Sequence, residues 1–201
     1  MQSFLSFLCE KDEGIGLTIF DVDETLFKTK ALINVVHDGK IIRKLDNQEF
    51  NTYKLKPGEQ FDFGEFKNAK IFHDTSIPIW AMIKKANAII RNATRKGSKV
   101  IVLTARANLD DKHRFLDTFR RYGIDIDKVY VERAGNLDLG SSAKNKRFTL
   151  HKYLRTGKYA RVRFFDDAVS NLNSFKALQK KYPMVSFSAY HVQHDGSVKK
   201  F

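Results

Sequence analysis

Two patterns of apolar residues alternate along the chain, one typical of buried strands and the other of amphipathic helices. Short apolar runs rich in β-branched or aromatic residues predict strands, and they cover residues 16–20, 99–103, 128–131, 161–165 and 184–187. Between them, apolar positions repeat at helical spacing over residues 79–93, 115–122, 144–154 and 169–181. Strands that alternate with helices predict a three-layer α/β fold, with a mainly parallel sheet and helices on both of its faces.

Residues 28–74 interrupt this alternation and are expected to form a flap and a small cap beside the sheet. Asp38 and Gly39 separate two apolar runs, 31–36 and 41–45. This dipeptide favours a β-hairpin, because both central residues of the matching turn need positive φ. The sequence therefore predicts a hairpin close to the end of the first strand.

The second part of this insertion, residues 50–72, is rich in phenylalanine and tyrosine. We expect these rings to form a small core of their own, and stacking on a nucleic-acid base is the alternative. A chain of 201 residues with 42% hydrophobic content can bury a sizeable core. The sequence therefore predicts one domain, residues 1–201, that carries the insertion.

Pairs of carboxylates follow two of the predicted strands. Asp21 and Asp23 come directly after the first strand, and Asp166 and Asp167 follow the strand at 161–165. Alternate residues of an extended segment project to the same side, so Asp21 and Asp23 are spaced to share one metal ion and one phosphoryl group. In a parallel sheet both pairs would lie at the same carboxyl edge, where ligands bind in α/β folds.

The net charge of +13 is unevenly distributed along the chain. Residues 1–75 contain 10 Lys and Arg against 13 Asp and Glu, a net charge of −3, whereas residues 76–201 contain 26 against 10, a net charge of +16. Basic residues cluster at 91–99, 112–121, 144–163 and 176–181. Such clusters predict an affinity for phosphate-rich partners such as DNA or RNA, and solvated outer faces of helices are the alternative interpretation.

A single cysteine, Cys9, excludes an internal disulfide and a cysteine-based zinc site. A reducing, cytoplasmic location is the natural expectation for such a chain. Residues 1–8 are apolar but lack a basic leader and soon meet acidic residues, so we expect no signal peptide. No apolar stretch is long enough to span a membrane.

Other metal sites fit the sequence less well. A calcium loop that begins at Asp21 needs Gly at its sixth position and Glu at its twelfth, but these are Leu26 and Leu32. His191 and His194 lie near the carboxyl terminus in a polar stretch and are expected to be a surface pair. The remaining histidines have no spacing that demands a role; they are His37, His73, His113 and His151.

Several segments together resemble the ordered motifs of the haloacid dehalogenase superfamily. They are Phe20 to Leu26 (FDVDETL), Val102 to Arg106 (VLTAR) and Phe164 to Asn171 (FFDDAVSN), together with a lysine near the start of the helix at 144–154. The resemblance extends from Asp21 to Asn171, and each of the three longer motifs follows a predicted strand. It implies a Rossmannoid core and a phosphatase activity. The whole chain also resembles small members of this superfamily from tailed bacteriophages.

The resemblance implies a role for each motif residue. Asp21 would be the nucleophile that forms an aspartyl-phosphate, and Asp23 would transfer protons as general acid and base. Thr104 would donate to a phosphoryl oxygen, and Lys146 would supply a fixed positive charge. Lys144 is also available for this last role, but the spacing of Lys146 to the helix resembles the family pattern better.

The resemblance also implies Mg²⁺ as the cofactor, because Mg²⁺ prefers oxygen ligands and keeps several waters. The expected ligands are the carboxylates of Asp21 and Asp167 and the main-chain carbonyl of Asp23. Asn171 stands where the family more commonly has a second acid. We therefore expect Asp166 to orient Lys146 or a metal-bound water.

Arg106 and Arg133 each follow a predicted strand at the same edge of the sheet. Either could bind a substrate phosphate with its guanidinium fork, and a salt bridge to a neighbouring acid is the alternative for both.

By resemblance, small insertions leave the active site open to macromolecules, and the strong basicity favours a nucleotide or nucleic-acid phosphate. The sharpest hypothesis is a polynucleotide 3′-phosphatase. The alternatives are a mononucleotide phosphatase of the deoxynucleotidase type and a nucleic-acid-binding protein that has lost turnover.

Overall fold

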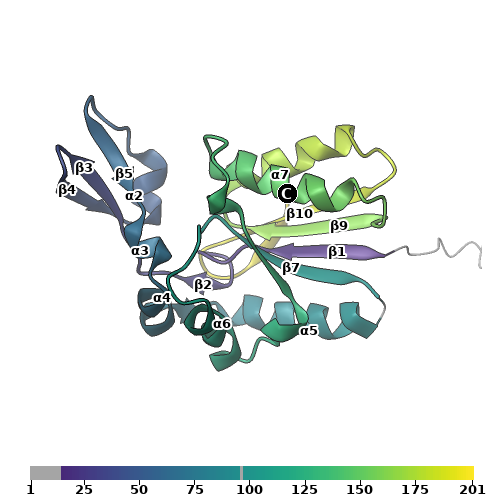
Figure 1. Cartoon of the computed structure of the whole chain (residues 1–201). Coiled ribbons are helices and arrows are strands. Elements are labelled where there is room, and N and C mark those ends of the chain that lie inside the picture. Colours follow the sequence, from purple (N-terminus) through teal and green to yellow (C-terminus); the bar gives the residue numbers. More distant parts are fainter. Residues whose placement is uncertain (1–14, 96) are drawn as a thin grey trace, which may run out of the picture.

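A central six-stranded sheet, mainly parallel, forms the framework of the molecule in the computed structural model, which describes residues 15–95 and 97–201 (Figure 1). The strand order is β11-β10-β9-β1-β7-β8, and only β11 pairs in the antiparallel sense. The strands are β1 (Gly16–Phe20), β7 (Lys99–Thr104), β8 (Tyr130–Arg133), β9 (Arg161–Asp166), β10 (Ser186–Val192) and β11 (Val198–Lys200). The predicted α/β fold with a mainly parallel sheet is confirmed.

Helices cover both faces of this sheet (Figure 1). One layer contains α5 (Trp80–Arg95) and α6 (Lys112–Arg121), and the other contains α7 (Ser142–Leu154) and α8 (Val169–Lys176). Successive side chains of β1 point alternately into the two helix layers, because side chains alternate across a strand. Phe20 packs in the core cluster with α5 and α6, whereas Leu17 and Ile19 pack with α7 and α8.

Local signals set where the helices begin and end. Ser141 accepts a hydrogen bond from the backbone N–H of Lys144 at the start of α7, and Asp111 does the same for Arg114 at the start of α6. Helix α5 ends just before Gly97, which has a φ of 67°.

Several predicted elements differ in extent from their expected ranges; helix α6, for example, begins at Lys112, three residues earlier than expected. The strand expected at 128–131 begins at Tyr130, because residues 126–128 form the 3₁₀ turn η1 (Ile126–Lys128). The helix expected at 169–181 tightens after Lys176 into η3 (Ala177–Lys180), a common way for a helix to end. The final parallel strand starts two residues later than expected and continues to Val192.

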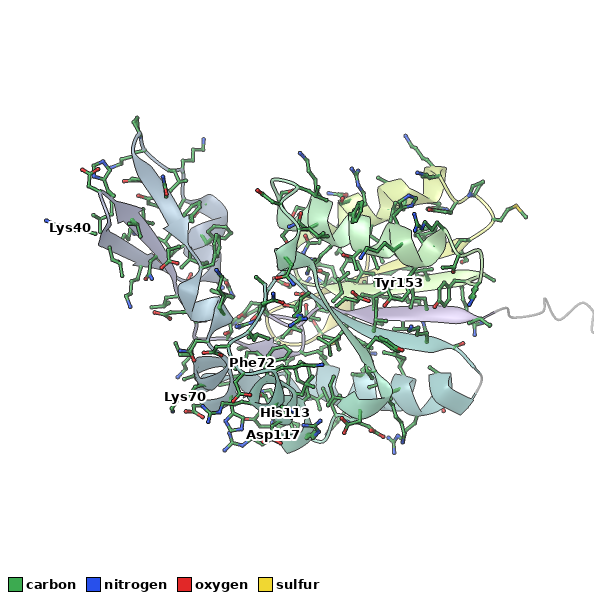
Figure 2. All side chains as sticks on the ribbon, viewed as in Figure 1. Lys40, Lys70, Phe72, His113, Asp117 and Tyr153 are labelled. Carbon is green, nitrogen blue, oxygen red and sulfur yellow. The ribbon has the colours of Figure 1, made fainter. Side chains whose placement is uncertain are left out.

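The insertion forms a lobe beside the carboxyl edge of the sheet. Its elements are β2 (Phe27–Lys28), β3 (Ile33–His37), β4 (Lys40–Leu45), α2 (Asn47–Thr52), β5 (Glu59–Asp62), α3 (Gly64–Lys67), α4 (Ala69–Thr75) and β6 (Ile77–Pro78). The expected hairpin is present as β3 and β4, and Asp38 and Gly39 in its turn have φ values of 50° and 72°. Lys40, at its tip, lies far from the central sheet (Figure 2).

Most aromatic rings of residues 50–72 form the lobe's own small core. Phe50, Tyr53, Phe61 and Phe66 pack against the buried residues of β3 and β4, which are Ile33, Val35 and Leu45. Phe72 is different, because it is fully buried in the main core between α4 and α6 (Figure 2). The expectation of a separate aromatic core is therefore confirmed for the part of the segment that precedes α4.

Two expectations concern residues that the structure does not describe. Cys9 and the apolar segment 1–8 lie outside the described residues. Within residues 15–95 and 97–201 we find no helix with the length and apolar character that a membrane crossing needs.

Candidate active site

The topology brings three of the predicted site residues to one edge of the sheet. Strand β1 lies between β7 and β9, with Phe20 in register with Val102 on one side and Phe165 on the other. Asp21 directly follows β1, Thr104 ends β7 and Asp166 ends β9. Their backbones thus reach the same carboxyl edge on three adjacent strands, as expected for ligand binding in a parallel sheet.

A cluster of three carboxylates surrounds one lysine at this edge. Oxygen atoms of Asp21, Asp166 and Asp167 all lie within 4.8 Å of one another. Lys146 Nζ donates to Asp21 Oδ1 at 2.6 Å and to Asp166 Oδ2 at 2.8 Å, and it is buried. Lys144, two residues earlier in α7, is exposed. The structure therefore brings Lys146 rather than Lys144 to the carboxylates.

This cluster is electrostatically unbalanced. Burial raises the pKa of Asp21 well above its usual value, although Lys146 opposes the increase. Burial and the nearby Asp166 raise the pKa of Asp167 to about 7. Burial acts to lower the pKa of Lys146, but attraction by Asp166 and Asp21 outweighs it and the pKa rises. Three carboxylates thus share one ammonium group.

The donor set fits a divalent cation with a preference for oxygen. All three acidic ligands are carboxylates, and one lysine cannot neutralise them. A dication would balance the remaining two negative charges and stabilise the ionised forms. The buried cluster of Asp21, Asp166 and Asp167 is thus able to hold a metal ion.

Asp166 and Asp167 have different surroundings, although they are adjacent in sequence. Asp166 accepts from Lys146, from the Ala168 N–H at 2.9 Å and, through both oxygens, from Asn171 Nδ2 at 2.9 and 3.1 Å. Asp167 accepts only one side-chain hydrogen bond among the described residues, from Thr25 Oγ1 at 3.4 Å. Asp166 is therefore held in place by protein donors, whereas Asp167 retains the greater capacity to bind a cation.

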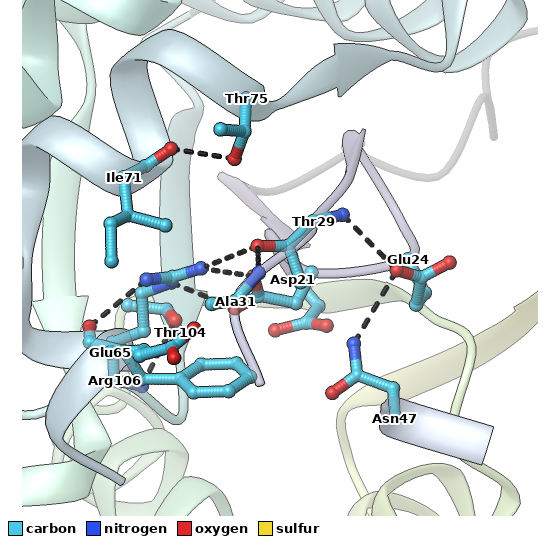
Figure 3. A network of polar contacts seen from close by, with 12 residues as sticks. Asp21, Glu24, Thr29, Ala31, Asn47, Glu65, Ile71, Thr75, Thr104 and Arg106 are labelled. Atoms are coloured by element: carbon cyan, nitrogen blue, oxygen red, sulfur yellow. Dashed lines mark hydrogen bonds and ion pairs between the residues drawn. The ribbon is translucent and has the colours of Figure 1, made fainter. Parts of the chain in front are cut away.

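Asp23 faces a different partner from Asp21. Arg106 donates two hydrogen bonds to the Asp23 carboxylate, from Nε to Oδ2 at 3.1 Å and from Nη2 to Oδ1 at 2.7 Å. The same guanidinium donates to Thr29 Oγ1 at 3.1 Å (Figure 3). It also donates to the main-chain oxygen of Phe66 at 2.9 Å. The rings of Phe66 and Phe72 lie against it, with distances of 4.8 and 4.6 Å from Cζ to the ring centroids.

Of the two roles considered for Arg106, the structure contains the salt bridge. Its side chain is fully buried, and its Nε, Nη1 and Nη2 atoms all have protein acceptors. Arg133 is different: it is half-buried and pairs in register with Thr104. Its guanidinium has no hydrogen bond or ion pair within the part of the chain that the structure describes. Arg133 thus keeps its donors available beside the carboxyl edge.

Thr104 is buried and linked to the loop that follows it. Its Oγ1 accepts from the N–H of Arg106 at 3.1 Å. The hydroxyl hydrogen is therefore free to donate to another acceptor.

A tight turn, residues 22–27, follows Asp21 at the end of β1 and positions the residues beside the site. The Val22 carbonyl accepts from the N–H groups of Leu26 and Phe27 at 2.9 and 3.0 Å, and Glu24 has a φ of 57°. The half-buried Glu24 carboxylate then accepts from the Thr29 N–H and from Asn47 Nδ2, at 3.2 and 3.4 Å (Figure 3). Burial raises the pKa of Glu24. The turn therefore connects the site to helix α2 of the lobe.

Sequence reasoning missed two contributors to the site. One is Thr25, whose hydroxyl donates to Asp167 Oδ1. His191, expected at the surface, is half-buried on β10 with Nε2 at 2.8 Å from the main-chain oxygen of Asp167. The sequence contained a signal for His191. A last strand that runs parallel to the strand before Asp166 must bring its carboxyl end to the same edge of the sheet.

No protein-family model matches the chain, and a search of curated proteins found no match. The fold and the carboxylate cluster therefore define the molecule as an α/β protein with a potential metal site. The superfamily resemblance stays an expectation based on the motifs.

Proposed function

We propose that this protein is a Mg²⁺-dependent phosphatase that forms an aspartyl-phosphate on Asp21. One observation carries the proposal: a buried cluster of three aspartates and one lysine at the carboxyl edge of a parallel sheet. Lys146 occupies Oδ1 of Asp21, and no donor of the described residues contacts Oδ2. A carboxylate with one oxygen anchored and the other open is suited to in-line attack on phosphorus.

In the first step, Asp21 Oδ2 attacks the phosphorus atom of a phosphomonoester and the bond to the leaving oxygen breaks. Lys146 keeps the nucleophile oriented through its 2.6 Å hydrogen bond. The Thr104 hydroxyl and Arg133 supply donors for the phosphoryl oxygens, whose charge must be stabilised during transfer. Mg²⁺, held by Asp21, Asp167 and the carbonyl of Asp23, would supply further electrostatic stabilisation when bound.

Proton transfer is assigned to Asp23. It protonates the leaving oxygen and later takes a proton from the water that hydrolyses the aspartyl-phosphate, which restores the Asp21 carboxylate. The Arg106 fork fixes the orientation of the Asp23 carboxylate, the form that accepts the proton from water. In its acid form, Asp23 loses most of this attraction to Arg106. The ion pair is therefore expected to loosen and re-form during turnover.

The proposed substrate is a nucleic-acid end that carries a 3′-phosphate, and a mononucleotide is the second candidate. Support comes from the charge of +16 over residues 76–201.

The test is phosphate release in Mg²⁺ or EDTA from a 3′-phosphorylated oligonucleotide, a 3′-mononucleotide and an aryl phosphate. Asp21→Asn keeps the shape of the side chain but removes the nucleophile, so we expect activity to fall at least about 10⁴-fold. Asp117→Asn, an exposed carboxylate on α6, is the matched control and should retain activity. With a ³²P-labelled substrate and an acid quench, wild type should carry label on the protein and Asp21→Asn should not.

The ranking of the three substrates then decides between a polynucleotide and a small-molecule phosphatase. Inactivity of the wild type on all three, or equal activity of Asp21→Asn, would overturn the proposal. In the first case, a nucleic-acid-binding protein without turnover would become the better interpretation.

A further inference from the structure

A basic groove runs along the outer surface of α7, on the side opposite the carboxylate cluster. It has a volume of about 510 Å³ and lies between α7 and the end of the α8–η3 segment. Its lining includes Leu139, Lys144, Arg147, Phe148, His151 and Lys181. Helices α7 and α8 cover the same face of the sheet (Figure 1). The structure thus brings together two basic clusters that are separate in the sequence, 144–163 and 176–181.

Helix geometry separates this groove from the active site. Each residue turns the helix by about 100°, so Arg147 and Phe148 point about 100° and 200° away from Lys146. Lys146 is buried against Asp21, whereas Arg147 and Phe148 are exposed. The groove is therefore a second surface, and its ligand need not touch the reacting atoms.

The positive charge of this surface is not neutralised by neighbouring acids. The groove is lined by Lys144, Arg147 and Lys181 and by no acid, and the acid nearest to it in the sequence is the exposed Asp138, next to Leu139. The side chains of Lys144, Arg147 and Lys181 form no ion pair with an acid within residues 15–95 and 97–201. Burial and the charges of Lys181 and Arg155 lower the pKa of His151, consistent with a positive field.

An aromatic ring accompanies the charges. The side chain of Phe148 is 44% exposed, and Lys152 Nζ lies 5.9 Å from its ring centroid. A positive groove with an exposed aromatic ring is the combination by which proteins bind single-stranded nucleic acid, because phosphates follow the charges and bases stack on the ring.

The chain itself connects this groove to the site. Arg133 lies in register with Thr104, and the following residues lead through η2 (Ala134–Asn136) to Leu139 at the groove. Asn145 fixes this loop to α7, since it bonds the Leu139 N–H at 3.1 Å and the Leu137 carbonyl at 2.5 Å. A strand with its end at Asp21 would meet this fixed loop as it leaves the site.

We propose that the groove between α7 and η3 binds the single-stranded part of a polynucleotide whose end occupies the active site. This inference rests on the proposed phosphatase function for the end of the strand. The groove itself has a readout that needs no catalysis.

The test measures binding of a fluorescent, unphosphorylated single-stranded oligonucleotide to the full chain. Arg147→Gln/Lys181→Gln should weaken binding at least about tenfold at low salt. It should also reduce the slope of log K against log salt by between about 1 and 2, as expected when two phosphate contacts are lost. Phe148→Ala should weaken binding at least about fivefold, with the salt slope kept.

The control is Lys84→Gln/Lys85→Gln, which removes the same charge from exposed positions of α5, on the other face of the sheet. It should leave affinity within about twofold. Equal losses of affinity in both double variants would contradict binding at the groove and would indicate that the positive charge of the whole surface attracts the oligonucleotide. If polyglutamate bound as tightly as the oligonucleotide and Phe148→Ala had no effect, the nucleic-acid proposal would be contradicted and an acidic protein partner would be favoured.

Catalysis provides a separate comparison. The ratio of kcat/KM for a 3′-phosphorylated oligonucleotide to that for a 3′-mononucleotide should fall about tenfold in Arg147→Gln/Lys181→Gln. If wild type binds the oligonucleotide through the groove but releases no phosphate, the proposed function fails and the groove stands. If wild type is active and this ratio does not change, the groove fails and the phosphatase stands.

Discussion

Lys146 is the only cation that contacts the carboxylates of Asp21 and Asp166 among the described residues, and all three side chains are buried. Breaking a buried ion pair leaves an uncompensated charge, which commonly costs about 3–5 kcal/mol. We therefore expect Lys146→Met to lower the free energy of unfolding by this amount in EDTA, measured by urea denaturation. Exposed Lys152→Met on the same helix is the control. A loss no larger than that of the control would contradict the charge balance described here.

Arg106, which is fully buried, and the half-buried Asp23 form a second ion pair with bidentate geometry. Arg106→Gln should destabilise the protein by about 3–5 kcal/mol, because Asp23 then loses its counter-charge. In the double variant with Asp23→Asn, the two costs should be less than additive by at least about 1 kcal/mol. Urea unfolding of the four proteins gives this interaction energy. Simple additivity would mean that the two side chains do not stabilise each other.

The sequence predicted that Asp21 and Asp166 would meet at one edge of the sheet, and the reason is geometric. Asp21 and Asp166 each follow an apolar run, and parallel pairing necessarily brings such positions to one edge. The same logic could not distinguish the partners of Arg106 from those of Arg133, since both follow strands at that edge. Their difference depends on the Phe66 carbonyl and the Thr29 hydroxyl, which belong to an insertion whose path has no periodic pattern.

At the scale of elements, the turn after β8 is packed against the loop that carries Arg106. A Cβ atom on Gly135 would lie 2.1 Å from the Ala105 carbonyl oxygen and 2.6 Å from the Ala107 nitrogen. Gly135→Ala should therefore cost about 1–3 kcal/mol of stability through overpacking. Gly64→Ala, whose Cβ would approach only the Asp62 side chain at 3.2 Å, should cost less than 1 kcal/mol. Equal urea midpoints for the two variants would contradict this packing.

The lobe has a much smaller core than the central sheet. Around β3, β4 and β5 its core consists of the buried side chains of Ile33, Val35 and Leu45, and the aromatic rings packed against them are partly exposed. Regions with few buried contacts open at lower free energy than the global transition. Native-state hydrogen exchange should therefore show lower opening free energies for β3, β4 and β5 than for β1 and β9. Equal values for both sets would mean that the lobe and the sheet unfold as one unit.

The strong periodicity of apolar residues made the strands of the sheet and the helices that cover it predictable. The ends of elements were misplaced where this periodicity weakens. Strand β1 and helix α5 have uninterrupted patterns, and both occur where expected. The 3₁₀ turns at 126–128 and 177–180 replace the expected start of a strand and the expected end of a helix, and apolar spacing does not encode their tighter hydrogen-bond pattern. The short pair β2 and β6 depends on contacts between distant residues, so local sequence had no signal for it.

For the whole molecule, a metal ion that binds only the folded state should stabilise it. At a Mg²⁺ concentration of 100 times Kd, the gain is about 2.7 kcal/mol, visible as a rise in Tm. Asp167→Asn should lose most of this gain, because Asp167 has the least protein neutralisation of the three carboxylates. Asp117→Asn should keep it. The same Mg²⁺ effect in both variants would place the metal elsewhere.

Arg106 contacts the lobe at Phe66 in two ways: Nη1 donates to its peptide oxygen, and its ring lies against the guanidinium. Any residue at position 66 offers that oxygen, but only an aromatic residue keeps the ring contact. An insertion or deletion within residues 63–67 would instead move the oxygen away. In divergent descendants of this chain, α3 should therefore keep its length and an aromatic residue at position 66, whereas its exposed positions, Gly64 and Lys67, should vary.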